Sequence, residues 1–296
     1  MSPPQFVIPL VIVFVESLTG FTLNTCLLVT NFKDWRRGRC LQLCDLLHMA
    51  LGLVNLLLQA AVSAHTTLCI VYLPILYIKE VYMMFCVVLP FLAYSSFWLN
   101  AWLCVYYVTT ITSSQNSFFV WLKSRISTMM SKLVLVSAVG SFSVSLLSIW
   151  NVSDPRKTNG SMTSNSSGNI LYLSFPYQMA AASLGCFLPF VLSILCIGHI
   201  LTFLARHVWR VKHDGSGFSR SGLRAHVRAV RTMILLVLLF VSFYLSQVFS
   251  FLAMQSNFFF LGLFFILFFP SGEALIIIQA NSKLRKAFVE MFSFGK

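Results

Sequence analysis

The side chains in this chain that could carry chemistry are few, and the most unusual of them lie inside long apolar stretches. Glu16, Gly20 and Asn24 recur every four residues, which places them on one face of a helix. Pro270-Ser-Gly-Glu273 sets a carboxyl group beside a proline and a glycine, which weaken a helix locally. Because an ionisable group inside a membrane costs several kcal/mol, such residues must face partners within a bundle. We expect Asn55 to be the partner of the first group.

Two roles are open for this core polar set. Its members are Glu16, Asn24, Asn55, Pro270 and Glu273. The two carboxyl groups can be protonated and hydrogen-bonded, and they then contribute only to fold specificity. Alternatively the set acts in a switch, because Pro90, Pro189 and Pro270 introduce bends at which helices can shift between two packings.

The other reactive residues form no catalytic or metal-binding pattern. The histidines are scattered, at positions 48, 65, 199, 207, 213 and 226. No serine or cysteine nucleophile has a recognisable base beside it. Cys40 and Cys44 are close in sequence, but small residues in apolar segments usually serve packing. We therefore expect no enzyme, no metal site and no cofactor.

Seven long apolar runs must position these residues. They lie at roughly 6–30, 41–66, 81–112, 127–149, 175–205, 232–254 and 258–280. Each run reaches the ~20 residues that a helix needs to cross a bilayer core of ~30 Å. With 58% hydrophobic residues, 10% charged residues and a mean hydropathy of +0.83, the chain has too little polar surface for a water-soluble globule. The sequence predicts a single all-α domain, a bundle of seven transmembrane helices.

The cations divide unevenly between the two sides of this bundle. Threading the seven runs through a membrane puts eighteen lysines and arginines on one side and three on the other. The three are Lys79, Arg156 and Lys157. Since cytoplasmic loops carry the excess of basic residues, we expect the amino terminus outside and the carboxyl terminus inside. The first residues lack a basic segment, so the first run itself should direct insertion.

The net charge of +13 follows mainly from this topology. Its basic residues lie in short loops beside helix ends, where anionic lipids and an acidic groove on a cytoplasmic protein are the natural partners. The sequence shows no nucleic-acid-binding module, so we expect no nucleic-acid partner.

Two connections are longer than the rest. The loop at 150–174 is rich in Ser, Asn, Thr and Gly and holds three glycosylation sequons, at Asn151, Asn159 and Asn165. Glycans are added on the luminal side, so these sequons agree with the predicted orientation. The cytoplasmic connection at 206–231 carries Arg224, Arg228 and Arg231 at helical spacing, either as a lipid-contacting ridge or as a docking surface. A basic tail at 281–296 follows the seventh run.

Several stretches are more specific. They are Asp34-Trp-Arg-Arg, Asp45-Leu-Leu, Leu103-Cys-Val-Tyr-Tyr, Phe119-Val-Trp-Leu-Lys, Pro189-Phe-Val-Leu-Ser, Ala225-His-Val-Arg-Ala-Val-Arg, Pro270-Ser-Gly and Asn281-Ser-Lys-Leu-Arg-Lys. In these stretches, almost from end to end, the chain resembles the type 2 taste receptors, the G-protein-coupled receptors for bitter compounds. It departs from them where Asn55 aligns with the family's arginine in span two and Glu273 with its histidine after Pro-Ser-Gly. The resemblance is that of a divergent member.

The resemblance implies a plasma-membrane receptor for bitter agonists that activates gustducin or another inhibitory-class heterotrimeric G protein. The agonist pocket is expected between the outer halves of spans two, three, five, six and seven. Its expected wall is mostly apolar and comprises Leu89, Leu92, Ala93, Ala182, Gly185, Phe243, Gln247 and Leu263. The expected coupling residues at the cytoplasmic side are Tyr107, Lys123, His207, His226, Arg228 and Arg231.

Two other functions are weighed against this interpretation. A vomeronasal type 1 receptor has the same layout, but the Pro-Ser-Gly and Ala-His-Val-Arg-Ala stretches favour the taste branch. A small-molecule transporter or channel needs paired polar residues along a path. Here the charge within the membrane is limited essentially to Glu16 and Glu273.

Overall fold

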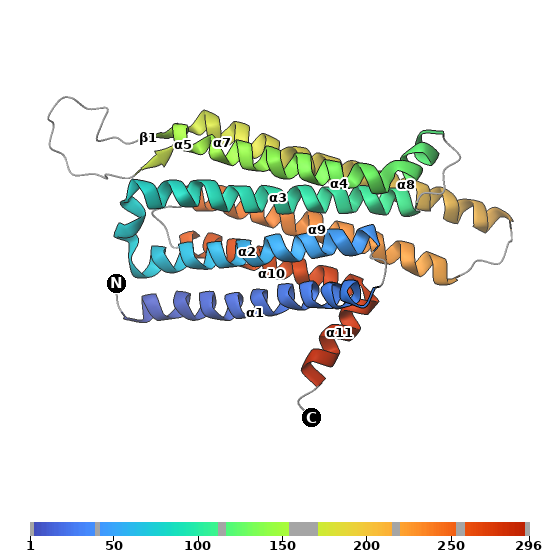
Figure 1. Cartoon of the computed structure of the whole chain (residues 1–296), viewed down its shortest axis with the longest axis horizontal. Coiled ribbons are helices and arrows are strands. Elements are labelled where there is room, and N and C mark those ends of the chain that lie inside the picture. Colours follow the sequence, from blue (N-terminus) through green and yellow to red (C-terminus); the bar gives the residue numbers. More distant parts are fainter. Residues whose placement is uncertain are drawn as a thin grey trace.

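The structure is a bundle of long helices that run along a common direction (Figure 1). A computed structural model describes residues 3–38, 42–111, 117–153, 171–214, 220–252 and 258–293. Within these ranges, the side chains of residues 3–6, 77, 117–124, 127, 207–214, 220–226, 247–252, 258–263 and 292 are outside the description. Nearly all of the described residues are helical, as the apolar runs predict.

The elements follow one another in a simple order. They are α1 Pro3–Arg36, α2 Leu43–Val71, η1 Leu73–Tyr77, α3 Lys79–Ile111, α4 Ser117–Leu146, α5 Ser148–Asn151, β1 Val152–Ser153, β2 Tyr172–Leu173, α7 Phe175–Ala182, η2 Ser183–Phe187, α8 Leu188–Asp214, α9 Arg220–Leu252, α10 Phe258–Ala280 and α11 Ser282–Ser293. In the part of the chain that the structure describes, six helices are long and apolar enough to cross a membrane, or seven if α10 and α11 count as one bent span.

The surface of these helices is as apolar as their interior. Phe14 on α1 and Val136 on α4 are each 68% exposed, and Leu135 and Val139 beside Val136 also face outward. Helices that are hydrophobic on all sides are stable only in lipid or in the core of a large protein. The outward apolar residues therefore mark the surface that meets the acyl chains.

Helix α3 occupies the centre of the bundle and packs against α2, α4, α8 and α9. Helix α10 packs against α1, α2 and α9, which places the first and last long helices side by side. The run predicted at 175–205 consists of α7, the π-helical turn η2 and α8. Gly185 in η2 lies against the ring of Tyr94, and a Cβ at this position would overlap that ring. The absence of a side chain here allows α3 and η2 to approach closely.

The two ends of the bundle differ (Figure 1). One end, here called the hairpin end, carries the amino terminus and the antiparallel pair β1 and β2, in which Val152 faces Leu173. The opposite end, here called the α11 end, carries α11 and the extensions of α8 and α9. At this end α1 stops where Gly38 adopts a φ of 71°, a conformation that favours glycine.

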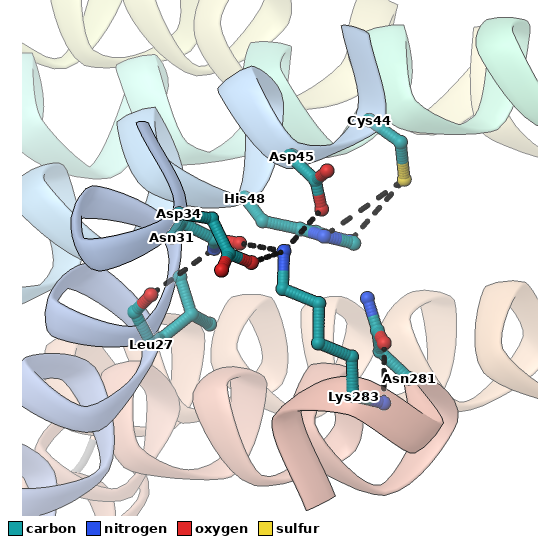
Figure 2. A network of polar contacts seen from close by, with 8 residues as sticks. All are labelled: Leu27, Asn31, Asp34, Cys44, Asp45, His48, Asn281 and Lys283. Carbon is teal, nitrogen blue, oxygen red and sulfur yellow. Dashed lines mark hydrogen bonds and ion pairs between the residues drawn. The ribbon is translucent and has the colours of Figure 1, made fainter. Parts of the chain in front are cut away.

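An ion-pair network fixes α11 against the rest of the bundle (Figure 2). The axis turns by 110° between α10 and α11, and Lys283 in the first turn of α11 points back toward α1 and α2. Its ammonium group lies 2.9 Å from Asp34 of α1 and 3.3 Å from Asp45 of α2, and it donates to Asn31 at 3.0 Å. Leu284, fully buried, packs beside it. One lysine thus joins three helices.

Replacing Lys283 with methionine keeps the aliphatic stem and removes the charge. Asp34 and Asp45 would then lose this cation and repel each other across the α1–α2 junction. Because the network is partly buried, the expected loss of stability is about 1–2 kcal/mol, between the values for exposed and buried ion pairs. Thermal unfolding of the purified protein measures it, with Lys286→Met on the exposed side of α11 as the matched control. Equal effects of the two variants would contradict the assignment.

The side chain of Asn151, in one of the three sequons, makes two hydrogen bonds. Its Nδ2 donates to the Leu147 carbonyl at 2.9 Å, and its Oδ1 accepts from the Ser174 hydroxyl at 3.1 Å. A glycan would replace one of the two hydrogens of this nitrogen and add a bulky group at the packed junction of α5 with α7. Asn159 and Asn165 lie outside the described residues.

We therefore expect Asn159 and Asn165 to carry glycans and Asn151 to remain unmodified. Separate substitutions to glutamine, followed by gel mobility with and without endoglycosidase, test each position. A lower glycoprotein mass for Asn151→Gln would show that this sequon is used.

Candidate functional site

The polar centre of the bundle is built around the carboxyl group of Glu273, which has no solvent exposure. Asn55 of α2 donates to Oε2 at 2.9 Å, and Ser96 of α3 lies 2.8 Å from the same oxygen. Asn100 of α3 donates from its Nδ2 to Oε1. The Ser96 hydroxyl is also 3.1 Å from Asn55 Oδ1. Amide and hydroxyl groups from α2 and α3 thus satisfy both oxygens of a buried acid on α10.

A second set of contacts ties α1 to α10 beside this centre. Glu16 accepts a hydrogen bond from Ser271 at 3.1 Å, two residues before Glu273. Asn24, also fully buried, donates to the Pro270 carbonyl at 3.3 Å and to the Gly20 carbonyl at 2.9 Å. Glu16 and Asn24 therefore both meet the Pro270-Ser-Gly-Glu273 segment.

Toward α9 the polar centre gives way to aromatic rings. Phe97, the residue after Ser96, packs against Phe240 and Phe243 of α9, with ring centroids 4.1 and 5.4 Å away. Phe269 of α10 lies 5.2 Å from Phe97 and 4.8 Å from Phe243. We call these four residues the phenylalanine cluster. It holds α3, α9 and α10 together by dispersion and edge-to-face contacts.

Among the described side chains of α9, the serine and threonine hydroxyls do not extend this network. The hydroxyls of Thr232, Ser242 and Ser246 donate to the carbonyls of Arg228, Leu239 and Phe243 on α9 itself. These hydroxyls serve their own helix, while Phe240 and Phe243 of the phenylalanine cluster contact α3 and α10.

Comparison with known proteins identifies this architecture. The family model described as taste receptor protein (TAS2R) matches residues 1–296, the whole chain. The chain belongs to the type 2 taste receptor family. It is a multi-pass membrane protein of the G-protein-coupled class for bitter taste, a class of receptors rather than enzymes.

The similarity to individual relatives is low but extends over nearly full length. Taste receptor type 2 member 2 of Homo sapiens is 28% identical over 302 residues, which cover 98% of this chain and 97% of that protein. Taste receptor type 2 member 9 of Homo sapiens is 28% identical over 295 residues, with 95% and 92% covered. Member 40 of Gallus gallus is 25% identical over 292 residues, with 94% and 91% covered. These values describe a divergent receptor.

The structure brings the predicted core polar set together, although with different partners. Asn55, expected to pair with the stripe on span one, hydrogen bonds to Glu273 on α10 instead. The reason is geometric, because α2 packs against both α1 and α10, and the side chain of Asn55 points to the latter. Asn55 and Glu273, two of the positions at which the sequence is expected to depart from the family pattern, are therefore in direct contact in this receptor.

The sequence analysis missed Ser96 and Asn100 of the Glu273 network and Lys283 of the ion-pair network. Ser96 and Asn100 are four residues apart within an apolar run, the same signal that singled out Glu16, Gly20 and Asn24. The role of Lys283 had no such signal, because it stands among several cations and its partners, Asp34 and Asp45, precede it by more than 200 residues.

Many of the residues predicted to line the agonist pocket converge on one apolar cluster. Leu92, Ala93 and Phe243 are buried there with Phe97 and Phe269, and Leu89 packs against them. Gly185 reaches the same cluster through Tyr94, while Ala182 is half-buried on α7. The side chains of Gln247 and Leu263 are outside the described residues.

The predicted coupling residues are described only in part. Arg228 and Arg231 are exposed on α9 toward the α11 end, and Tyr107 is half-buried on α3 among apolar residues. The side chains of Lys123, His207 and His226 are outside the described residues. Among the described residues, no group of three or more His, Cys, Asp or Glu side chains is placed to hold a metal ion.

Glu273 can be tested with its closest isostere. Glutamine at this position keeps the shape but replaces one accepting oxygen with an amide nitrogen. That nitrogen would face either the donors of Asn55 and Ser96 or the donor of Asn100, so a buried donor would lose its acceptor. We expect Glu273→Gln to lower stability by about 1–3 kcal/mol and to raise basal signalling or impair surface expression.

Thermal unfolding and ligand-free signalling normalised to surface protein measure these effects. Glu290→Gln on the exposed part of α11 is the control. If the variant at position 273 were indistinguishable from the native receptor, this carboxyl group would have no role in the packing.

Proposed function

We propose that this bitter taste receptor lies in the plasma membrane with its hairpin end outside and binds small, largely lipophilic bitter compounds in the outer half of the bundle. Binding leads to activation of gustducin or another inhibitory-class heterotrimeric G protein at the α11 end. The observation that carries the proposal is the convergence of the predicted pocket residues Leu92, Ala93 and Phe243 on the phenylalanine cluster.

The chemistry of this cluster supports apolar agonists. The four rings offer aromatic surface, and Leu92 and Ala93 beside them offer aliphatic surface. Affinity would therefore come from desolvation and dispersion rather than from ion pairs. Few polar anchors imply limited discrimination between ligands and dissociation constants on the order of micromolar. The rings must also shift to admit an agonist, because they pack against one another at centroid distances of 4.1 to 5.4 Å.

Helix α9 supplies the connection to the cytoplasmic side. Phe243 belongs to the phenylalanine cluster, and Arg228 is exposed fifteen residues earlier on the same helix. At 1.5 Å per residue, the agonist contact and the basic stripe are about 22 Å apart along one rigid element. An agonist that tilts α9 at Phe243 would displace the arginines at its other end.

Such an agonist must favour the active packing over the resting one. A compound with equal affinity for both shifts nothing, and a shift from 1:99 to 99:1 requires about 5.5 kcal/mol of differential binding. Weak agonists of this receptor should therefore produce partial responses. The opened face would present Arg228 and Arg231 to an acidic groove or helix of the G protein.

Calcium release in cells that express the receptor tests the proposal with a panel of bitter compounds. A response is expected only where a suitable G-protein alpha subunit is supplied. Arg228→Ala should abolish that response without reducing surface expression, because the side chain is exposed. His226→Ala is expected to do the same on the strength of the sequence motif.

Arg36→Ala serves as the matched control, because Arg36 is an exposed arginine at the same end of the bundle on α1. It should signal normally. A response that persists without the alpha subunit, or native signalling by Arg228→Ala, would refute the proposal.

A further inference from the structure

A small cavity lies between α3, α8 and α9, beside the Glu273 network. Its volume is about 10 Å³. Asn100 and Cys104 of α3 and Ser193 of α8 contribute polar atoms to its lining, and Phe97, Phe190 and Phe240 contribute rings. A cavity needs roughly 10–15 Å³ to hold one water molecule, so this one is too small for an organic ligand and matches a single water.

Asn100 supplies an acceptor that needs a donor. Its Nδ2 donates to Glu273, so Oδ1 on the same planar amide points away from that carboxyl group. This oxygen is buried, and no described group donates to it. Buried side-chain oxygens in native proteins nearly always have a hydrogen-bond partner, either protein or ordered water.

Ser193 of α8, which also lines the cavity, supplies a second acceptor. Its hydroxyl donates to the Pro189 carbonyl at 2.8 Å, which uses its one hydrogen. The same hydroxyl also lies within hydrogen-bond reach of the Cys104 thiol, and an oxygen with two lone pairs can still accept from one further group. The cavity therefore presents acceptors from two helices in a space that fits a molecule with two donors.

We propose that this cavity holds one ordered water molecule that donates hydrogen bonds to Asn100 Oδ1 and Ser193 Oγ. The water extends the Glu273 network from α2, α3 and α10 to α8. It lies beneath Phe240 of α9, a member of the phenylalanine cluster. The polar network and the aromatic contacts of α9 then meet at one solvent molecule.

A density map of the purified receptor at a resolution that shows ordered water tests the proposal directly. A peak is expected within about 2.7–3.2 Å of both Asn100 Oδ1 and Ser193 Oγ. A map in which the cavity is empty, or is filled by a side chain, would overturn it.

A double-mutant cycle gives an independent measurement. One water needs both partners, so Asn100→Leu and Ser193→Ala should lower the melting temperature by less in combination than the sum of their separate shifts. Ser183→Ala is the matched control for the second change. The Ser183 hydroxyl also donates to a carbonyl four residues earlier at 2.8 Å, but it is exposed and away from the cavity.

In the control cycle, the shifts of Asn100→Leu and Ser183→Ala should add. Additive shifts for Asn100→Leu with Ser193→Ala would contradict the bridging water. If Asn100→Leu fails to fold, the native density map still decides the question.

Discussion

The need to satisfy a buried carboxyl group governs the centre of this receptor. Glu273 lies among apolar helices in a chain that spans the membrane, where an unpaired acid is strongly unfavourable. Asn55 of α2 and Ser96 and Asn100 of α3 form hydrogen bonds with this carboxyl group. Because hydrogen bonds require defined distances and angles, these contacts fix the relative height of α2, α3 and α10. The nonspecific packing of Leu and Phe could not set that register alone.

The phenylalanine cluster begins one residue from this network, and its position follows from it. Ser96 and Phe97 are neighbours on α3, so fixing the first toward α10 directs the second toward α9. Aromatic contacts are tolerant of small rotations, whereas the amide contacts to Glu273 are not. The receptor therefore has a rigid polar layer directly beside an adaptable apolar one, which is suitable for recognising varied small molecules.

The general architecture could be predicted from the sequence because it follows from local properties. Long apolar runs predict helices in a membrane, and the polar residues Glu16, Asn24, Asn55 and Glu273 predict inward faces whatever their partners are. The pairing itself could not be derived in this way. The contact of Asn55 with Glu273 joins residues 218 positions apart, and that of Lys283 with Asp45 joins residues 238 apart. Such contacts depend on which helices are neighbours and how each is rotated, and periodicity fixes neither. The close approach of Gly185 to the ring of Tyr94 was missed for a similar reason, since that ring belongs to another helix.

The Lys283 network holds some helices of the receptor more firmly than others. Lys283 ties the first turn of α11 to α1 and α2. On α9, by contrast, the described hydroxyls of Thr232, Ser242 and Ser246 bond to carbonyls of α9 itself, and the phenylalanine cluster packs the helix against α3 and α10. A force on Phe243 would therefore move α9 more readily than α1 and α2, which Lys283 holds to α11. The carboxyl-terminal helix would then keep its place against α1 and α2 while α9 moves.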